Sequence, residues 1–313
     1  MRVSTHSYTD AMLNQFNSLA ALQYSLQSRA STGLRVQTAS DDPVAMADTL
    51  GLAAKKTANT QWSQNITTLS DRANVIYSVL QSVQTKTSRA GEIATAAATA
   101  TASPSDLNNY ATEINALIED TVKLGNVKNP TDGSFLFGGT ASGSAPFAVT
   151  RNANGDVASV AYNGNSTVNR AEISDGLTVS VDVPGVNTGS IGARGLFTDS
   201  QTGGDFLNHL ISLRDNLRAG NKPAVTADSL NFKQDENNVA YQVANNGVVQ
   251  NRLITAAAYL ADNSAALDKS ISNKSGADLA DTVVQLNRAQ TGYQAALQTS
   301  AKIMQLSILN YIQ

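Results

Sequence analysis

Hydrophobic residues in the last part of the chain recur at alternating steps of four and three residues. The series starts at Leu279 and continues through Val283, Leu286, Gln290, Tyr293, Leu297, Ser300, Met304 and Ser307 to Tyr311. This spacing is the heptad pattern of a coiled coil, in which the repeated positions of one helix pack against a partner helix. The pattern predicts a terminal helix over residues 279–311 that pairs with another helix.

The polar face of this helix disappears after residue 302. Aliphatic residues then lie on its other sides as well, at Ile303, Leu306, Ile308, Leu309 and Ile312. A helix that is apolar all round has to be buried all round. We therefore expect several partners around this part of the helix, some of them other molecules.

The first helix is expected over about residues 5–32 and has the same four–three spacing of hydrophobic residues. Its repeated positions are Tyr8, Met12, Gln15, Leu19, Leu22 and Leu26, with Phe16 beside them. Gly33 can adopt the left-handed conformation that ends a helix. Because both ends of the sequence carry sparsely charged amphipathic helices, we expect these two helices to pair.

Two longer helices are expected between them, over about residues 44–101 and 224–272. Their heptad series run from Trp62 to Val83 and from Val243 to Ile271. Proline suits the first position of a helix and disfavours helical geometry in the residue before it, so Asp42 and Pro43 predict a capped helix start. Shorter helices are expected from Ser103-Pro104 and from Asp205.

The hydrophobic period changes to two between the third and fourth helices. Short strands are expected at residues 135–139, 146–150, 157–162, 168–173 and 177–183, with Asn154-Gly155 and Asn163-Gly164 as hairpin turns. Insertions are tolerated at exposed loop tips. We therefore expect that residues 142–184 can be replaced by a short linker without loss of assembly contacts.

The pattern as a whole predicts a mainly α protein. Its fold is a long antiparallel coiled-coil helical bundle, with both termini paired at one end and a small β-rich insert at the other. The expected domains are residues 1–40 with 275–313 as an axial assembly domain of paired terminal helices, 41–133 with 203–274 as a helical bundle, and 134–202 as a β-rich inserted domain.

Composition excludes several classes of protein. The sequence has no cysteine, which excludes disulfides, cysteine zinc sites and thiol catalysis. A pI of about 5.4 without Lys/Arg runs argues against nucleic acid or an anionic membrane as a partner. No basic stretch followed by an apolar run occurs near residue 1, so no cleavable signal peptide is expected. No apolar stretch reaches the roughly 20 residues of a membrane span.

Candidate chemistry is sparse. The two histidines, His6 and His209, are far apart and form no His-Glu-x-x-His motif. Asp235-Glu236 is expected to lie on a solvated helix face, and the acidic pair at Asp42 to cap a helix. We expect no enzymatic activity, catalytic residue, metal or cofactor. A secreted hydrolase carried in the insert is a distant alternative and would need a convergent polar site in residues 134–200.

Several short motifs resemble, in their order along the chain, the bacterial flagellin superfamily. They are Arg2-Val3-Ser4-Thr5, Ser31-Thr32-Gly33-Leu34-Arg35-Val36, Ser40-Asp41-Asp42-Pro43-Val44-Ala45, the stretch 132–139, Pro146-Phe147 and the stretch 306–312. The resemblance covers about residues 1–150 and 240–313. The start of the sequence, its ending and Pro43 favour the flagellin-like junction proteins over the filament flagellin, in which small residues more usually follow the acidic pair.

The resemblance implies an extracellular structural subunit of the flagellum that joins the hook to the filament. Its implied partners are the first hook–filament junction protein, flagellin, other copies of itself, an export chaperone and the type III export apparatus; the alternative is flagellin itself. A cytoplasmic coiled-coil scaffold would not need apolar ends. We expect the terminal helices to become ordered only on assembly. The predicted interface residues are Met12, Phe16, Leu19, Leu22, Leu26, Tyr293, Leu297, Met304, Leu306, Leu309, Tyr311 and Ile312.

Overall fold

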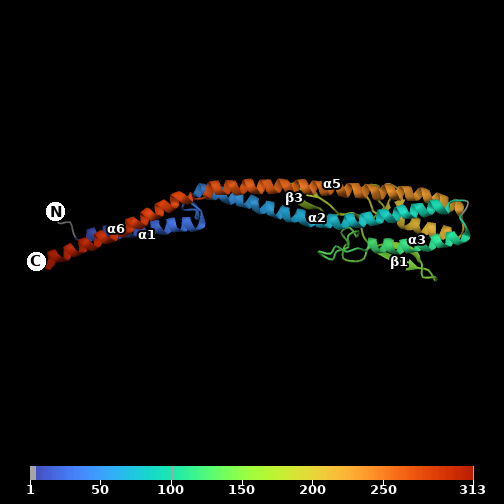
Figure 1. The fold of residues 1–313 in the computed structure, drawn as a ribbon, viewed down its shortest axis with the longest axis horizontal. Coiled ribbons are helices and arrows are strands. Elements are labelled where there is room, and N and C mark those ends of the chain that lie inside the picture. Colours follow the sequence, from blue (N-terminus) through green and yellow to red (C-terminus); the bar gives the residue numbers. More distant parts are fainter. Residues whose placement is uncertain (1–4, 100–101, 313) are drawn as a thin grey trace. The chain divides into compact units, whose positions relative to one another are not determined.

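The computed structural model describes residues 5–99 and 102–312, and it describes side chains for residues 10–99 and 102–302. The helices are α1 (Thr5–Thr32), α2 (Pro43–Ala97), α3 (Pro104–Gly125), α4 (Phe206–Arg218), α5 (Lys222–Ser275) and α6 (Leu279–Ile312) (Figure 1). The strands are β1 (Phe147–Arg151), β2 (Val157–Tyr162), β3 (Ala171–Ser174), β4 (Leu177–Val179), β5 (Val186–Asn187), β6 (Thr198–Asp199) and β7 (Gly204–Asp205). This confirms a mainly α fold with a small β-rich insert.

The chain forms two compact units. The first contains Met1–Ala58 and Asp262–Gln313, and the second contains Asn59–Ala261. The division falls inside α2 and α5, which each contribute residues to both units.

Local signals in the sequence explain where several helices begin and end. Asp42 caps α2 because its Oδ1 accepts a hydrogen bond from the Ala45 amide at 3.0 Å. Ser103 and Asp106 form a capping box at the start of α3, in which each side chain bonds the other residue's amide. Gly33, with φ +69°, ends α1 and donates its amide to the Arg29 carbonyl. These contacts supply hydrogen-bond partners for backbone N–H and C=O groups that have none within the helix.

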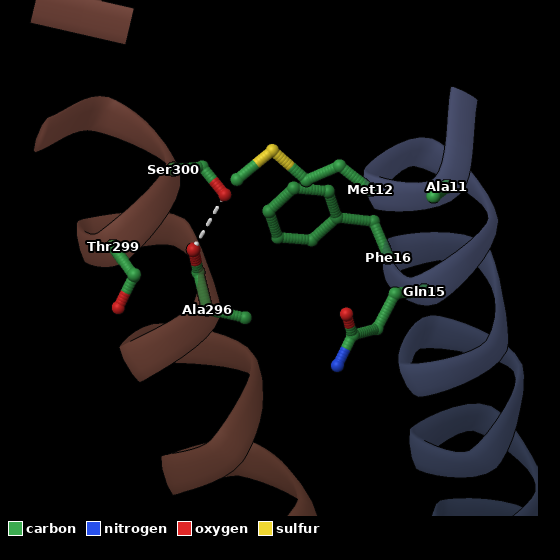
Figure 2. Close-up of a pocket in the computed structure, with 7 residues that line it drawn as sticks. All are labelled: Ala11, Met12, Gln15, Phe16, Ala296, Thr299 and Ser300. Atoms are coloured by element: carbon green, nitrogen blue, oxygen red, sulfur yellow. Dashed lines mark hydrogen bonds between the residues drawn. The ribbon is translucent and has the colours of Figure 1, made fainter. Parts of the chain in front are cut away.

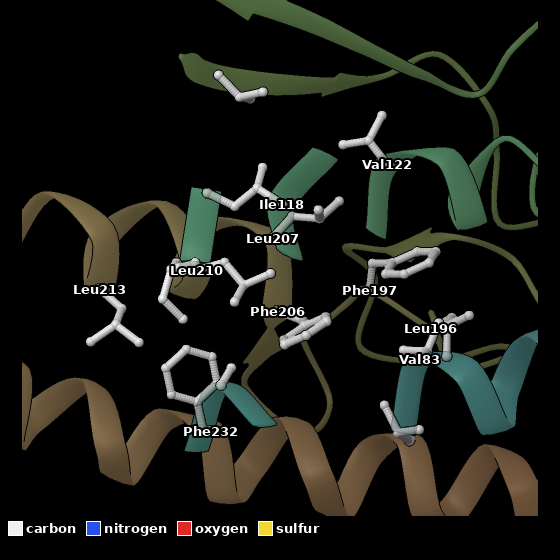
Figure 3. Packing of buried hydrophobic residues seen from close by; sticks show 14 of the residues in the cluster. Val83, Ile118, Val122, Leu196, Phe197, Phe206, Leu207, Leu210, Leu213 and Phe232 are labelled. Carbon is white, nitrogen blue, oxygen red and sulfur yellow. The ribbon is translucent and has the colours of Figure 1, made fainter. Parts of the chain in front are cut away.

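The core of the second unit lies among α2, α3, α4 and α5. Figure 3 shows Phe206, Leu210 and Leu213 of α4 packed with Ile118 of α3 and Phe232 of α5. The rings of Phe206 and Phe232 meet edge to face with centroids 6.2 Å apart. The helical stripes expected from the sequence therefore form one apolar core, because each stripe needs another against which to be buried.

The β-rich insert contains small sheets, and several of its expected strands are wrong. β1 pairs with β2, and β3 with β4, in antiparallel hairpins, while β5, β6 and β7 form a third sheet. Asn154-Gly155 is a hairpin turn as expected, but Asn163-Gly164 is not, because β2 does not pair with β3. Residues 135–139 form a bridge and turns rather than a strand, since Gly139 has φ +64°. β3 and β4 are also shorter or shifted relative to the expected strands.

The insert is part of the core of the second unit. Phe147 and Val157 are buried in the same cluster as Phe197, and the Phe147 and Phe197 rings are 5.2 Å apart. The β3–β4 hairpin, with Ile173 and Val179, packs against α2 and α5 in a second apolar cluster. Replacing residues 142–184 by a linker would therefore expose both clusters, and the expectation that this segment is dispensable is wrong.

Arginine side chains connect the insert to the helices of this unit through hydrogen bonds and ion pairs. Arg214 of α4 is 2% exposed and donates to the Val157 carbonyl at 2.6 Å. Arg218 binds both oxygens of Asp156, at 2.6 and 3.2 Å. Arg72 of α2 donates to Asp182 at 2.6 Å. Charges in such places are tolerated only when they are paired, so these contacts set the position of the insert.

Asp235 does not lie on a solvated face, contrary to expectation. It is buried, and its Oδ2 is 2.7 Å from His209 Nδ1, while its Oδ1 accepts a hydrogen bond from the Asp205 amide. Asp228 lies near the same histidine and accepts hydrogen bonds from Ser212 and Asn216. The sequence could not predict this, because a lone His and a distant Asp carry no spacing signal.

The His209–Asp235 pair predicts a pH dependence of stability. Burial opposes the charged imidazole, but the hydrogen bond and charge of Asp235, together with the charges of Asp205 and Asp228, outweigh burial and raise the pKa of His209 above its ordinary value of 6.5. Burial also raises the pKa of Asp235. A histidine whose pKa is raised on folding stabilises the folded protein at pH values below its pKa in the unfolded chain, and this stabilisation is lost as pH rises through its pKa in the folded protein. A carboxyl group whose pKa is raised on folding also makes the folded protein less stable as pH rises. Thermal unfolding of the second unit should therefore occur at lower temperature as pH rises from 6.5.

The matched variant for this prediction is His209→Gln, which removes the titrating group and retains an amide donor. Its melting temperature should change less over the same pH range, measured by circular dichroism in one set of buffers. A slope identical to that of the parent chain would contradict the assignment.

Candidate assembly interface

The pairing of α1 with α6 organises the first unit. The two helices run side by side in opposite directions, so that the start of α1 lies near the end of α6 (Figure 1). Phe16 and Tyr293 meet edge to face, with ring centroids 6.0 Å apart and planes inclined by 79°. This geometry suits aromatic pairs, and it fixes the register between the two helices.

A cleft lies beside this aromatic pair. It has a volume of about 320 Å³ and is lined by Ala11, Met12, Gln15 and Phe16 of α1 and by Ala296, Thr299 and Ser300 of α6. Met12 and Phe16 extend toward α6, where the Ser300 hydroxyl donates to the Ala296 carbonyl at 2.7 Å (Figure 2). Small side chains on α6 thus leave space that Met12 and Phe16 do not fill. A side chain of another molecule that entered this cleft would make packing contacts that α1 and α6 do not supply to each other.

The buried face of α6 consists mainly of small or polar residues. Its described residues with little or partial exposure recur in four–three steps at Thr282, Leu286, Ala289, Tyr293, Ala296 and Ser300. The large aliphatic residues Leu279, Val283 and Leu297 lie along one edge and are 51%, 46% and 46% exposed. α1 therefore covers the side of α6 whose residues gain the least hydrophobic free energy when they are buried.

The α1 helix shows a similar imbalance. Met12, Phe16 and Leu19 are half-buried and Leu26 is buried, whereas Leu22 is 48% exposed. Leu13 and Tyr24 are exposed as well, at 58% and 76%. Single exposed apolar residues are common on proteins, but several of them on two paired helices make these helices candidates for contacts with other molecules. We call the exposed residues Leu13, Leu22, Tyr24, Leu279, Val283 and Leu297 the terminal apolar edge.

Backbone hydrogen bonds tie the loop after α1 to the break between α5 and α6. The Ser275 carbonyl accepts hydrogen bonds from the Arg35 and Val36 amides at 2.7 and 3.3 Å, and the Ala277 amide donates to the Gly33 carbonyl at 2.8 Å. The Arg35 side chain also donates to the Lys274 carbonyl at 2.9 Å. These bonds join the end of α1 to the start of α6. We call this set of contacts the clasp.

Asp41 and Asp42, the acidic pair that follows the clasp, stabilise the turn that leads into α2. Asp41 accepts hydrogen bonds from the Thr38 and Gln37 amides, and these hold the pKa of Asp41 below its ordinary value. The Ala45 amide and the neighbouring Arg35 similarly lower the pKa of Asp42. Both carboxylates therefore remain charged at neutral pH and fix the turn into α2, as the capping interpretation requires.

The clasp predicts a strong effect of one glycine. A Cβ at Gly276 would lie 2.4 Å from the Ser272 carbonyl oxygen, so Gly276→Ala has to displace backbone. We expect a loss of about 1–3 kcal/mol and faster hydrogen exchange at the Arg35 and Ala277 amides. In the control, Gly292→Ala, nothing lies within 4 Å of the added Cβ, and the helix should gain roughly 0.5–1 kcal/mol. Unchanged exchange in Gly276→Ala would contradict the clasp.

The structure separates the predicted interface residues into three groups. Met12, Phe16, Leu19, Leu26 and Tyr293 are wholly or partly buried within the first unit. Leu22 and Leu297 remain exposed. The side chains of Met304, Leu306, Leu309, Tyr311 and Ile312 lie outside the described residues.

The sequence prediction missed Leu13 and Tyr24, which lie outside the heptad series of α1. Counting every large apolar residue, rather than only those in four–three steps, would have found them. Leu279 and Val283 belong to the heptad series of α6 and were expected on its paired face, but the structure leaves them exposed because Thr282 and Ala289 lie toward α1.

The described residues contain neither a metal-binding cluster nor a membrane span. No group of three or more His, Cys, Asp or Glu residues among them is placed to hold a metal ion. No described helix has a stretch apolar enough to cross a membrane.

Comparison with known proteins gives consistent matches. The family model of the bacterial flagellin N-terminal helical region matches residues 3–142, and that of the C-terminal helical region matches residues 231–312. Flagellar hook-associated protein 3 of Salmonella typhimurium is 30% identical over 149 residues, 47% of this chain and 46% of that protein. The Escherichia coli protein of the same name is 34% identical over 152 residues, with the same coverage. The chain thus spans about half the length of the curated relatives it matches.

Solved structures support the fold. One described as a flagellar hook-associated protein from Vibrio parahaemolyticus aligns with a TM-score of 0.63 and 21% identity, covering 75% of this chain and all of that one. At this identity the likeness concerns the fold alone. Since the two family models together match most of the chain and in the expected order, the chain belongs to the bacterial flagellin family.

Proposed function

We propose that this chain is a structural subunit of the bacterial flagellum that joins the hook to the filament. The observation that carries the proposal is the terminal apolar edge, which the chain leaves exposed although both terminal helices are paired. The curated relatives named flagellar hook-associated protein 3 support the junction in particular. Filament flagellin is the alternative within the same family.

The physical role of the terminal helices follows from their packing. Each leucine that passes from water to a buried contact contributes about 1.5–3 kcal/mol, less the entropy of ordering. Neighbouring subunits that cover the terminal apolar edge and the cleft at Met12 would gain this free energy. A repeated head-to-tail contact that does not close produces a tube or helix, which is the form that an axial structure needs.

Two of the three proposed domains each combine a segment from the first half of the chain with a segment from the second half. Residues 1–40 and 275–313 form the axial assembly domain, residues 41–133 and 203–274 form the supporting helical bundle, and residues 134–202 form the β-rich inserted domain. The proposed partners are the first junction protein on the hook, flagellin, and further copies of this chain. Export would proceed through the flagellar type III apparatus, with the help of a chaperone.

The proposal does not require catalysis. Asp156 of the insert and Arg214 of α4, which lies against the insert, are both bonded to protein partners. A hydrolase in the insert would instead need a free convergent site. A screen of the purified chain against peptide, ester and glycoside substrates should show no turnover, and reproducible turnover abolished by a substitution in the insert would favour the hydrolase.

Gene deletion followed by electron microscopy tests the junction function. Cells without this chain should carry bare hooks and release flagellin into the medium, and a plasmid copy should restore filaments. Hooks that still carry filaments would contradict the proposal. Loss of all filament protein from both cells and medium would favour filament flagellin instead, and antibody labelling along the whole filament would do the same.

A further inference from the structure

The sequence contains three Asn-Gly pairs, at Asn154-Gly155, Asn163-Gly164 and Asn246-Gly247. In such a pair the backbone nitrogen of glycine can attack the side-chain carbonyl carbon of asparagine. The reaction needs rotation of the joining peptide, which glycine permits because it has no side chain. The local structure decides which of the three pairs is free to make this rotation.

Asn154 occupies the freest position. It lies in the turn between β1 and β2, its side chain is exposed, and its described contact is a backbone one, an amide donated to Asn152 Oδ1 at 3.0 Å. Gly155 has φ +84°, and nothing lies within 4 Å of the place where a Cβ would be. One exposed turn bond, from the Gly155 amide to the Asn152 carbonyl at 3.0 Å, has to open before the nitrogen can attack.

Asn163 is exposed too, but its glycine is held. The place of a Gly164 Cβ is 2.5 Å from the Tyr162 ring and 2.8 Å from the Gly138 carbonyl oxygen. The Tyr162 hydroxyl lies 2.9 Å from the Phe137 carbonyl and 3.0 Å from that of Asn165. The next amide, of Asn165, donates to the Gly138 carbonyl. The peptide at Gly164 therefore cannot rotate without displacing this packing.

Asn246 is the most restrained of the three. It lies in α5 and is 3% exposed. Its Nδ2 donates to the Ala73 carbonyl at 3.3 Å, and its Oδ1 accepts from Gln250 at 2.9 Å. Gly247 is also inside the helix, where the backbone geometry is fixed by hydrogen bonds. Reaction at this pair requires local unfolding of α5.

We infer that Asn154 is a site of spontaneous deamidation in the folded protein, through a succinimide with Gly155. A bond forms between the Gly155 nitrogen and Asn154 Cγ, and the bond from Cγ to the amide nitrogen breaks. The proton of the Gly155 amide leaves with that nitrogen as ammonia. Solvent water then opens the ring at either carbonyl and gives aspartate or isoaspartate, so that asparagine and water become the acid and ammonia.

The product alters a turn that anchors the insert. Arg151 donates to the Gly155 carbonyl at 2.9 Å and also binds Glu119 of α3. Asp156 binds Arg218 of α4 and donates its amide to Asn152. Isoaspartate lengthens the main chain between these anchors and adds a negative charge. Deamidation should therefore loosen the β1–β2 hairpin from α3 and α4 as the protein ages.

Peptide mapping of the intact purified chain tests this inference. After incubation in warm, mildly alkaline buffer, isoaspartate should appear at Asn154 about tenfold faster than at Asn163 or Asn246. A ratio of this size requires only a modest difference between the sites in the free energy of local opening. In denaturant the three rates should become similar, since the restraints are structural. Asn154→Gln should abolish the main product, and the matched Asn163→Gln variant should leave it unchanged. Equal or faster reaction at Asn163 or Asn246 in the folded chain would overturn the assignment.

Discussion

Replacing both Leu22 and Leu297 with serine should prevent incorporation into the flagellum without unfolding the chain. These leucines are 48% and 46% exposed in the first unit, and exposed substitutions usually change stability by less than about 0.5 kcal/mol. If neighbouring subunits bury them, each change removes about 1.5 kcal/mol of contact. Together that is roughly a hundredfold weaker association.

Three measurements on the double variant separate assembly from folding. Circular dichroism should give the parental melting curve, secretion assays should find the chain outside the cell, and microscopy should find hooks without filaments. The matched control is Ile191→Ser, because Ile191 is 84% exposed but lies in the insert. Normal filaments with the double variant would show that the terminal apolar edge is not an interface, and a lower melting temperature would show that it supports the subunit's own core.

Phe197→Ala should cause the largest loss of stability in the second unit. Phe197 is fully buried, and its ring lies 5.9 Å from that of Phe137 and 5.2 Å from that of Phe147, both nearly perpendicular. Truncation of a buried phenylalanine costs about 3–5 kcal/mol. For a unit of this size the melting temperature should fall by roughly 10 °C.

The control at this position is Phe197→Leu, which keeps an apolar side chain and loses only part of the ring contacts. Its loss should be clearly smaller, measured by urea unfolding with fluorescence of Trp62, which packs partly buried against the second cluster. A loss below about 1 kcal/mol for Phe197→Ala, a value typical of peripheral sites, would show that the insert is not part of this core.

The helices were predictable from the sequence because their apolar residues repeat over many turns. The bounds of α1, Thr5–Thr32, agree with the expected range. Boundary residues such as Asp42, Pro43 and Gly33 carry capping signals that act locally. The terminal pairing was also predictable, since two sparsely charged amphipathic helices need partners.

The insert was less predictable because short strands depend on tertiary contacts. Val181 and Val183 alternate as in a strand, yet they are buried without belonging to one. The choice of face on α6 was also beyond the sequence. The heptad series places Leu279 on the paired face and omits Thr282, whereas the packing against α1 buries Thr282 and leaves Leu279 exposed. Asp235 was missed for a similar reason, because its partner His209 comes from another helix.

The most direct test of the account is thiol labelling at the terminal apolar edge. The sequence has no cysteine, so Leu22→Cys or Leu297→Cys introduces a single reactive thiol, and Ile191→Cys provides a control in the insert. The account predicts rapid labelling of all three in the secreted monomer, and strong protection of the first two, but not of the third, in sheared flagella. Equal labelling of Leu22→Cys and Leu297→Cys in monomer and flagella would contradict the claim that neighbouring subunits bury this edge.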